Sequence, residues 1–127
     1  MAQVLIVDDD PDIQVLIKAA ARHFSNISIV SAFTVEDAKK ALDMVDDLLY
    51  VTLDWKLPDG TGQEVIEYMR KRNINIPIVL YTGCPAAVEY AKKEYPGVLA
   101  LEKTQTSALL NFIEMAEAPR THIAASN

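Results

Sequence analysis

The sequence predicts an α/β protein: a flavodoxin-like, doubly wound (βα)5 fold whose five-stranded parallel sheet has the strand order 2-1-3-4-5. Short, continuously apolar runs alternate along the chain with segments whose apolar residues recur at helical spacing. The apolar runs show no polar alternation, which is typical of parallel strands buried on both faces. Right-handed crossovers leave few possible orders for five strand–helix units, and this order is one that fits.

Length and composition limit the class of protein. The 127 residues predict one domain, at residues 1–117, followed by a flexible C-terminal tail or linker stub at residues 118–127. The net charge of −6 argues against direct nucleic-acid binding, which needs a basic patch. The single cysteine, Cys84, cannot form an intrachain disulfide, and no apolar run approaches the roughly 18 residues of a membrane span. We therefore expect a cytoplasmic protein that does not contact a membrane.

Five apolar runs are expected to form the strands of the sheet. They are rich in Val, Ile, Leu and Tyr, and they lie at residues 4–7, 27–30, 49–53, 76–81 and 98–101. Pro77 falls near the beginning of the fourth run, where the lack of an N–H group is tolerated.

The helices between these strands are marked by their first residues. Three of them begin with a side chain that can accept hydrogen bonds from the first turn: Asp10 (before Pro11), Thr34 (with Asp37) and Thr61 (with Glu64). The fourth helix, around residues 87–93, has few apolar repeats, and we expect it to be short or irregular. The last helix is predicted over residues 107–116.

Polar side chains follow the carboxyl ends of four predicted strands. Asp8 and Asp9 follow the first strand and Asp54 follows the third. Thr82 follows the fourth strand and Lys103 the fifth. Because ligands of open α/β sheets bind beyond these strand ends, beside strand 1, we expect the five side chains to converge there.

Three carboxylates at one edge need a compensating charge. Two unit charges 4 Å apart repel by roughly 4 kcal/mol at an effective dielectric constant of about 20. Either a carboxyl pKa rises or a cation binds, and an all-oxygen site suits Mg²⁺ or Mn²⁺. A metal, an ammonium and a hydroxyl beside a carboxylate are suited to phosphoryl transfer, in which an Asp can itself become an acyl phosphate.

The chain resembles the receiver domain of bacterial two-component response regulators. The resemblance covers about residues 3–116 and rests on four segments in this order: Val7-Asp8-Asp9-Asp10, Leu53-Asp54 with Lys56-Leu57-Pro58-Asp59-Gly60, Tyr81-Thr82-Gly83, and Glu102-Lys103. It implies a phosphorylation-controlled signalling switch rather than an enzyme, beyond self-catalysed phosphotransfer and autodephosphorylation. It also implies that a histidine kinase or phosphotransfer protein is the phosphoryl donor.

The resemblance assigns a role to each residue of the edge. Asp54 would be the phosphoacceptor. Asp9 and Asp54 would bind Mg²⁺ (or Mn²⁺) directly, Asp8 would do so through water, and the backbone carbonyl of Lys56 would be a further ligand.

The same resemblance describes the switch. Lys103 would pair with the phosphoryl group and Thr82 would move toward it, so that these two residues act with Asp54 in the chemistry. The protein-interaction surface would then change, and a receiver homodimer or an effector domain or protein would respond.

Several positions depart from the family pattern or tune it. Ala100 replaces a common Tyr or Phe, and Thr104 replaces a common Pro, so we expect a trans bond and a differently shaped loop there. In such domains the positions of Lys56 and Cys84 tune how fast water removes the phosphoryl group. Trp55, next to Asp54, could shield the site or signal from it.

Two other functions remain open at this point. One is a degenerate receiver that acts as a phosphorylation-independent binding module, an alternative supported by Ala100 and Thr104. The other, less favoured, is a small Mg²⁺-dependent aspartyl phosphatase. The sequence also leaves open whether the chain is a single-domain regulator or a receiver excised from a longer protein.

Overall fold

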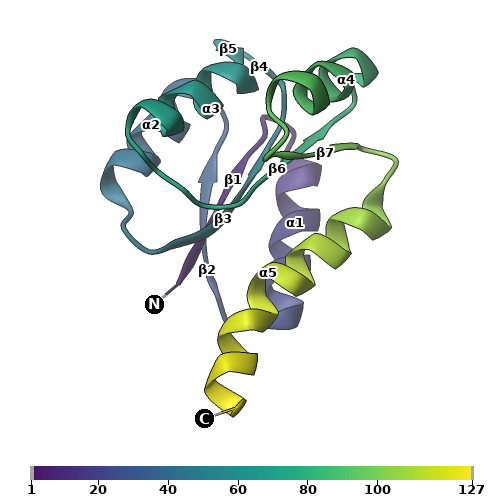
Figure 1. Cartoon of the computed structure of the whole chain (residues 1–127). Coiled ribbons are helices and arrows are strands. Elements are labelled where there is room, and N and C mark those ends of the chain that lie inside the picture. The colour runs from purple at the N-terminus through teal and green to yellow at the C-terminus, as the bar shows by residue number, and fades with distance from the viewer. Residues whose placement is uncertain (1, 127) are drawn as a thin grey trace.

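The computed structural model is a three-layer α/β sandwich, and it describes residues 2–126, with side chains for residues 2–118 (Figure 1). Its parallel sheet has the order β2-β1-β3-β6-β7, which confirms the predicted order 2-1-3-4-5. The strands are β1 Gln3–Val7, β2 Ser28–Ala32, β3 Leu48–Leu53, β6 Ile78–Thr82 and β7 Leu99–Glu102. The fourth predicted strand therefore begins two residues late, after Pro77.

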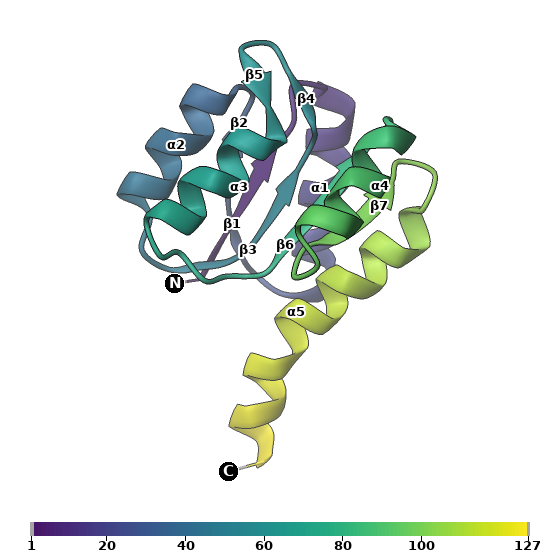
Figure 2. The same ribbon diagram turned by 45° about the horizontal axis from the view of Figure 1, so that its top comes forward.

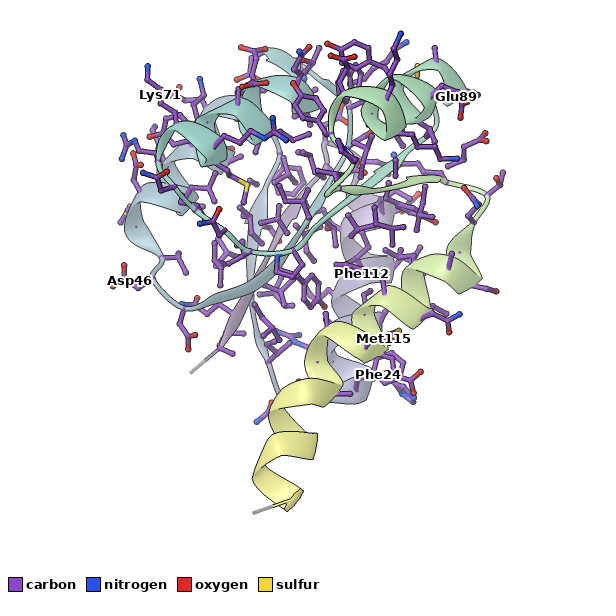
Figure 3. The ribbon with its side chains drawn as sticks, viewed as in Figure 1. Phe24, Asp46, Lys71, Glu89, Phe112 and Met115 are labelled. Atoms are coloured by element: carbon purple, nitrogen blue, oxygen red, sulfur yellow. The ribbon has the colours of Figure 1, made fainter. Side chains whose placement is uncertain are left out.

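Helices cover both faces of the sheet. Helices α1 Pro11–Phe24 and α5 Thr106–Ser126 lie on one face, and the others lie on the opposite face: α2 Val35–Met44, α3 Gly62–Lys71 and α4 Pro85–Glu94 (Figures 1 and 2). Each face has its own apolar core, because successive side chains of a strand point to opposite faces. Charged side chains such as Lys71 and Glu89 stand at the periphery of α3 and α4 (Figure 3).

The predicted helix starts are confirmed by their caps. Asp10 accepts a hydrogen bond from the Asp12 N–H (2.9 Å), and Thr34 accepts one from the Asp37 N–H (3.0 Å). At α3, the side chains of Thr61 and Glu64 form a complete capping box. Local sequence therefore fixes where the helices leave the carboxyl edge of the sheet.

The loop after β3 forms a hairpin that the sequence did not predict. Strand β4 Lys56–Leu57 pairs antiparallel with β5 Gly60–Thr61. At its turn, Asp59 accepts hydrogen bonds from the N–H groups of Val35 (2.7 Å) and Glu36 (3.0 Å), which lower the pKa of its carboxyl group. The hairpin is thereby tied to the first turn of α2.

Helix α4 contradicts the expectation of a short or irregular helix. It is an unbroken helix of 10 residues, as long as α2 and α3. Its buried residues are Ala87, Val88 and Ala91. Alanine is the strongest helix former, and its small side chain lets α4 lie close to the sheet without a row of large apolar residues.

Helix α5 continues past residue 116, where the sequence predicted its end, and projects away from the sheet (Figure 2). Glu117 is only 4% exposed, and its carboxylate accepts hydrogen bonds from the hydroxyls of Tyr50 (2.8 Å) and Ser25 (2.8 Å). These bonds anchor α5 to β3 and to the end of α1. Neither α5 nor another helix within residues 2–126 is long and apolar enough to cross a membrane. The tail at residues 118–127 stays a prediction.

Replacing Tyr50 with Phe tests this anchor. The change keeps the ring, which packs edge-on against Phe112 (5.5 Å between centroids), and removes a hydrogen bond to buried Glu117. Because bonds to buried charged groups are stronger than neutral ones, the free energy of unfolding in urea should fall by about 2 kcal/mol. Tyr68→Phe is the control, since its hydroxyl donates to exposed Asp43 (2.6 Å), and its effect should be much smaller. Equal effects of the two variants would contradict the anchor.

Candidate functional site

Three carboxylates meet at the carboxyl edge of the sheet. One oxygen from each of Asp8, Asp9 and Asp54 lies within 4.8 Å of the others. Asp8 follows β1 and Asp54 follows β3, and these strands are neighbours whose last residues, Val7 and Leu53, pair directly. The side chains of Asp8 and Asp54 are almost fully buried, whereas Asp9 is exposed. The structure thus brings together all three predicted acidic residues.

The ammonium group of Lys103 bridges the two buried carboxylates. Its Nζ lies 3.0 Å from Asp8 Oδ2 and 3.0 Å from Asp54 Oδ2. The backbone N–H of Lys103 donates to the Thr82 carbonyl (2.8 Å), which fixes the loop after β7 against the end of β6. A cation from the edge strand therefore reaches the centre of the acidic site.

Burial and neighbouring charges shift the pKa values of Asp8 and Lys103. Burial raises the pKa of Asp8 to about 6, with the charge of Asp54 adding to it and the Asp10 N–H and Lys103 opposing it. Burial alone would lower the pKa of Lys103, but its hydrogen bonds to Asp54 and Asp8 outweigh that effect and raise it. The site therefore holds a firmly protonated lysine beside a carboxyl group whose pKa is raised.

Hydrogen bonds with neighbouring backbone groups hold Asp54 in place. Its own N–H donates to the Val7 carbonyl (2.9 Å), and its Oδ1 accepts the Trp55 N–H (2.7 Å). A Cβ at Gly62 would lie 2.6 Å from the Asp54 carbonyl oxygen, so only glycine lets α3 begin this close. Sequence reasoning missed Gly62; its signal is a glycine directly after the capping residue Thr61, where helix propensity disfavours it.

The remaining predicted site residues surround this centre. Thr82 ends β6, is 1% exposed, and its hydroxyl accepts the Cys84 N–H (3.4 Å). Lys56 is exposed on the β4–β5 hairpin. The half-buried residues Trp55 and Cys84 share a pocket of about 380 Å³, which is lined by Trp55, Gln63, Cys84, Ala86, Ala87 and Tyr90.

Strand β7 has no aromatic ring at the position of Ala100, and a tyrosine of β6 contacts the loop after β7. Ala100 is buried on β7 with no ring, and no peptide bond in residues 2–126 is cis, as expected for the bond before Thr104. The Tyr81 hydroxyl instead donates to the Lys103 carbonyl (3.0 Å) and lies 3.1 Å from Thr106 Oγ1. Tyr81 therefore links β6 to the loop that carries Lys103 and to the first turn of α5.

Fold and site together define a class: a doubly wound α/β domain with an acidic, lysine-bridged site at the carboxyl edge of its sheet. The sequence matches the response regulator receiver domain family over residues 4–109. The chain therefore belongs to the response regulator receiver domain family. It is a phosphorylation-switch receiver, a phosphoacceptor signalling module with a phosphoaspartate site, and the acidic triad is of the type that binds Mg²⁺ in these domains.

Two curated relatives illustrate the membership. The chain is 32% identical over 81 residues to the response regulator protein PilR of Pseudomonas aeruginosa, covering 64% of this chain. It is 33% identical over 115 residues to the photosynthetic apparatus regulatory protein RegA of Rhodovulum sulfidophilum, covering 85% of this chain. The chain spans only 18% of the length of PilR and 61% of the length of RegA.

Solved structures share the fold. The receiver domain of the Francisella response regulator 1452 superposes with a TM-score of 0.76 at 22% identity, covering 91% of this chain and 96% of that one. The response regulator TrrA of Thermotoga maritima, in complex with Mg²⁺-BeF, has a TM-score of 0.66 at 25% identity, covering 80% of this chain and 85% of that one.

Asp8→Asn tests the electrostatics of the metal-free site. The folded protein binds the Asp8 proton more tightly than the unfolded chain, because the pKa is about 6 instead of the ordinary 3.8. Between these values the unfolded chain holds fewer protons, so the Asp8 contribution to stability is lost as pH rises. In EDTA, the free energy of unfolding of the wild type should therefore fall from about pH 4 to about pH 6 relative to Asp8→Asn. The free energies are measured by urea denaturation at each pH. If the free energy of unfolding of the two proteins changed equally with pH across this range, the raised pKa of Asp8 would be ruled out.

Proposed function

We propose that Asp54 accepts a phosphoryl group from a histidine kinase or a phosphotransfer protein in the cytoplasm, and that this changes the protein-interaction surface of the domain. The observation that carries the assignment is the position of Asp54. Strand β3 lies between β1 and β6. Asp54 therefore lies between the strand that precedes Asp8 and Asp9 and the strand that ends in Thr82, and the Lys103 ammonium bridges Asp54 to Asp8.

We propose that Mg²⁺ or Mn²⁺ binds directly to Asp9 and Asp54 and through water to Asp8, with the backbone carbonyl of Lys56 as a further ligand. The support is chemical: carboxylate and carbonyl oxygens are the ligands that these hard cations prefer, and three carboxylate oxygens lie within 4.8 Å of one another. The bound metal would supply positive charge to the phosphoryl oxygens. The related TrrA structure holds Mg²⁺ together with BeF, which supports a divalent-cation site in this chain.

The chain's own residues account for the transfer. An oxygen of Asp54 attacks the phosphorus of the donor's phosphohistidine, a P–O bond forms, and the P–N bond breaks so that the imidazole stays with the donor. Lys103 already bonds Asp54 Oδ2 (3.0 Å), and its ammonium turns to the incoming phosphoryl oxygens. The Thr82 hydroxyl donates to the same group, and both interactions grow as negative charge gathers there.

Movement of Thr82 would transmit the change. The Thr82 hydroxyl accepts the Cys84 N–H, and Cys84 directly precedes α4, so the start of α4 would follow Thr82. Trp55 packs edge-on against Tyr90 of α4 (5.7 Å), which couples the residue after Asp54 to the same helix. We propose that Lys56, Cys84 and Trp55, which lie close in sequence to Asp54 or Thr82, modulate the phosphorylation of Asp54 and the loss of the phosphoryl group. The responding surface would meet a second receiver or an effector.

Tryptophan fluorescence tests the proposed acceptor, because Trp55 is the sole tryptophan of the sequence and follows Asp54 directly. With Mg²⁺ and beryllofluoride, a phosphoryl analogue, the wild type should show a saturable change. The change should vanish in Asp54→Asn and in EDTA. A folded wild type that gives no change would indicate a degenerate receiver instead, and repeated turnover of a phosphoester would indicate a phosphatase.

Lys103→Met tests the role of the ammonium group. The variant keeps an aliphatic stem but removes the charge that stabilises the transferring group, so phosphoryl incorporation from acetyl phosphate should slow roughly 100-fold. The rate is measured by intact-protein mass spectrometry. Lys71→Met is the control, since Lys71 lies exposed on α3, and its rate should stay near that of the wild type. Similar rates for the two variants would argue against a role for Lys103 in the transfer.

A further inference from the structure

A buried glutamine lies beneath the acidic residues. Gln14 belongs to the first turns of α1 and is only 4% exposed. The other buried residues of α1 are the apolar Ile17, Ala20 and Ala21. A polar side chain therefore occupies the one buried position of this helix that lies nearest to the carboxyl edge.

The Gln14 amide ties together the ends of two strands. Its Nε2 donates to the carbonyl oxygens of Ile6 (3.1 Å), Asp8 (3.0 Å) and Ala32 (3.1 Å). The Asp8 N–H donates to the same Ala32 carbonyl (3.0 Å). An amide nitrogen carries two N–H groups, so the three carbonyls share them. One side chain thus holds α1 against the points where β1 and β2 end.

The segment that Gln14 holds carries two of the acidic residues. Only residues 8–10 separate β1 from α1. Within this segment, Asp8 Oδ1 accepts the Asp10 N–H (2.9 Å), and the Asp8 carbonyl is bound by Gln14. Asp8 is therefore held by hydrogen bonds at its backbone N–H, its backbone carbonyl and its carboxylate. Asp9 follows directly in the chain, and its carboxylate lies near that of Asp54.

Packing alone does not account for Gln14. Its Oε1 is buried and has no hydrogen-bond partner among the side chains and backbone that the structure describes. An unsatisfied buried acceptor is unfavourable, and a methionine would fill the same space without it. The hydrogen bonds from Gln14 Nε2 to three backbone carbonyls therefore explain why an amide occupies this position.

We infer that Gln14 is a positioning residue for the divalent cation: it holds the backbone of Asp8 so that the carboxylates of Asp8 and Asp9 face Asp54. This inference rests on the proposed function, because it takes these three carboxylates as the metal ligands. Residues that orient metal ligands commonly change metal affinity about 10- to 100-fold when they are replaced.

Gln14→Met tests the inference, because methionine has a similar length and no N–H donor. Mg²⁺ alone is titrated and followed by Trp55 fluorescence and by the rise in melting temperature. Relative to the wild type, Gln14→Met should bind Mg²⁺ about 10-fold more weakly. Without metal, hydrogen exchange at the N–H groups of Asp8 and Asp10 should also be faster. Ile17→Val is the control, since it alters the buried face of the same helix but leaves the hydrogen bonds of Gln14 in place. This variant should keep wild-type Mg²⁺ affinity.

Equal Mg²⁺ affinity in Gln14→Met and Ile17→Val would overturn the inference while leaving the proposed function intact. A wild type that does not bind Mg²⁺ would overturn both. If Gln14→Met does not fold, Gln14→Asn, which keeps the amide on a shorter stem, replaces it. A several-fold weaker affinity in Gln14→Asn supports the inference, and an unchanged affinity overturns it.

Discussion

The contact of one ammonium group with two carboxylates is the constraint on which the carboxyl edge depends. Parallel pairing of β1 with β3 places Asp8 and Asp54 side by side, and both are buried. Two such charges 4 Å apart repel by roughly 4 kcal/mol at an effective dielectric constant of about 20. Lys103 offsets this repulsion from the far edge strand, so β1, β3 and β7 share one electrostatic contact. The same contact leaves a cation beside the oxygen that would receive a phosphoryl group.

Each charged group of this contact is held by a different part of the scaffold. Gln14 binds the backbone of Asp8 from the face covered by α1 and α5. Gly62 lets α3 approach the backbone of Asp54 from the opposite face, and Tyr81 binds the carbonyl of Lys103 from β6. Because these contacts involve backbone, the side chains that they orient remain free to exchange partners. A phosphorylation switch needs such fixed backbone around its charged side chains, so that a new charge at Asp54 acts on defined neighbours such as Thr82 and Lys103.

The sheet order and the acidic edge could be predicted from sequence because both follow from local patterns: continuous apolar runs mark the strands, and the residues after each strand mark the edge. Gln14 and Glu117 could not be predicted. A polar residue in an amphipathic helix normally faces solvent, and only tertiary structure shows that these two are buried and bonded. The length of α4 could not be predicted for a related reason, because Ala87 and Ala91 gain their burial from the closeness of the sheet and not from their size. The roles of individual residues came from family resemblance.

We propose that Asp54, rather than Asp8 or Asp9, becomes the acyl phosphate. Treating the protein with acetyl phosphate and Mg²⁺, reducing the acyl phosphate with borohydride and mapping the product by peptide mass spectrometry locates the modified carboxylate. We expect conversion of Asp54 to homoserine, dependent on Mg²⁺ and on Lys103. Modification of Asp8 or Asp9, or the absence of modification in a folded protein, would contradict it.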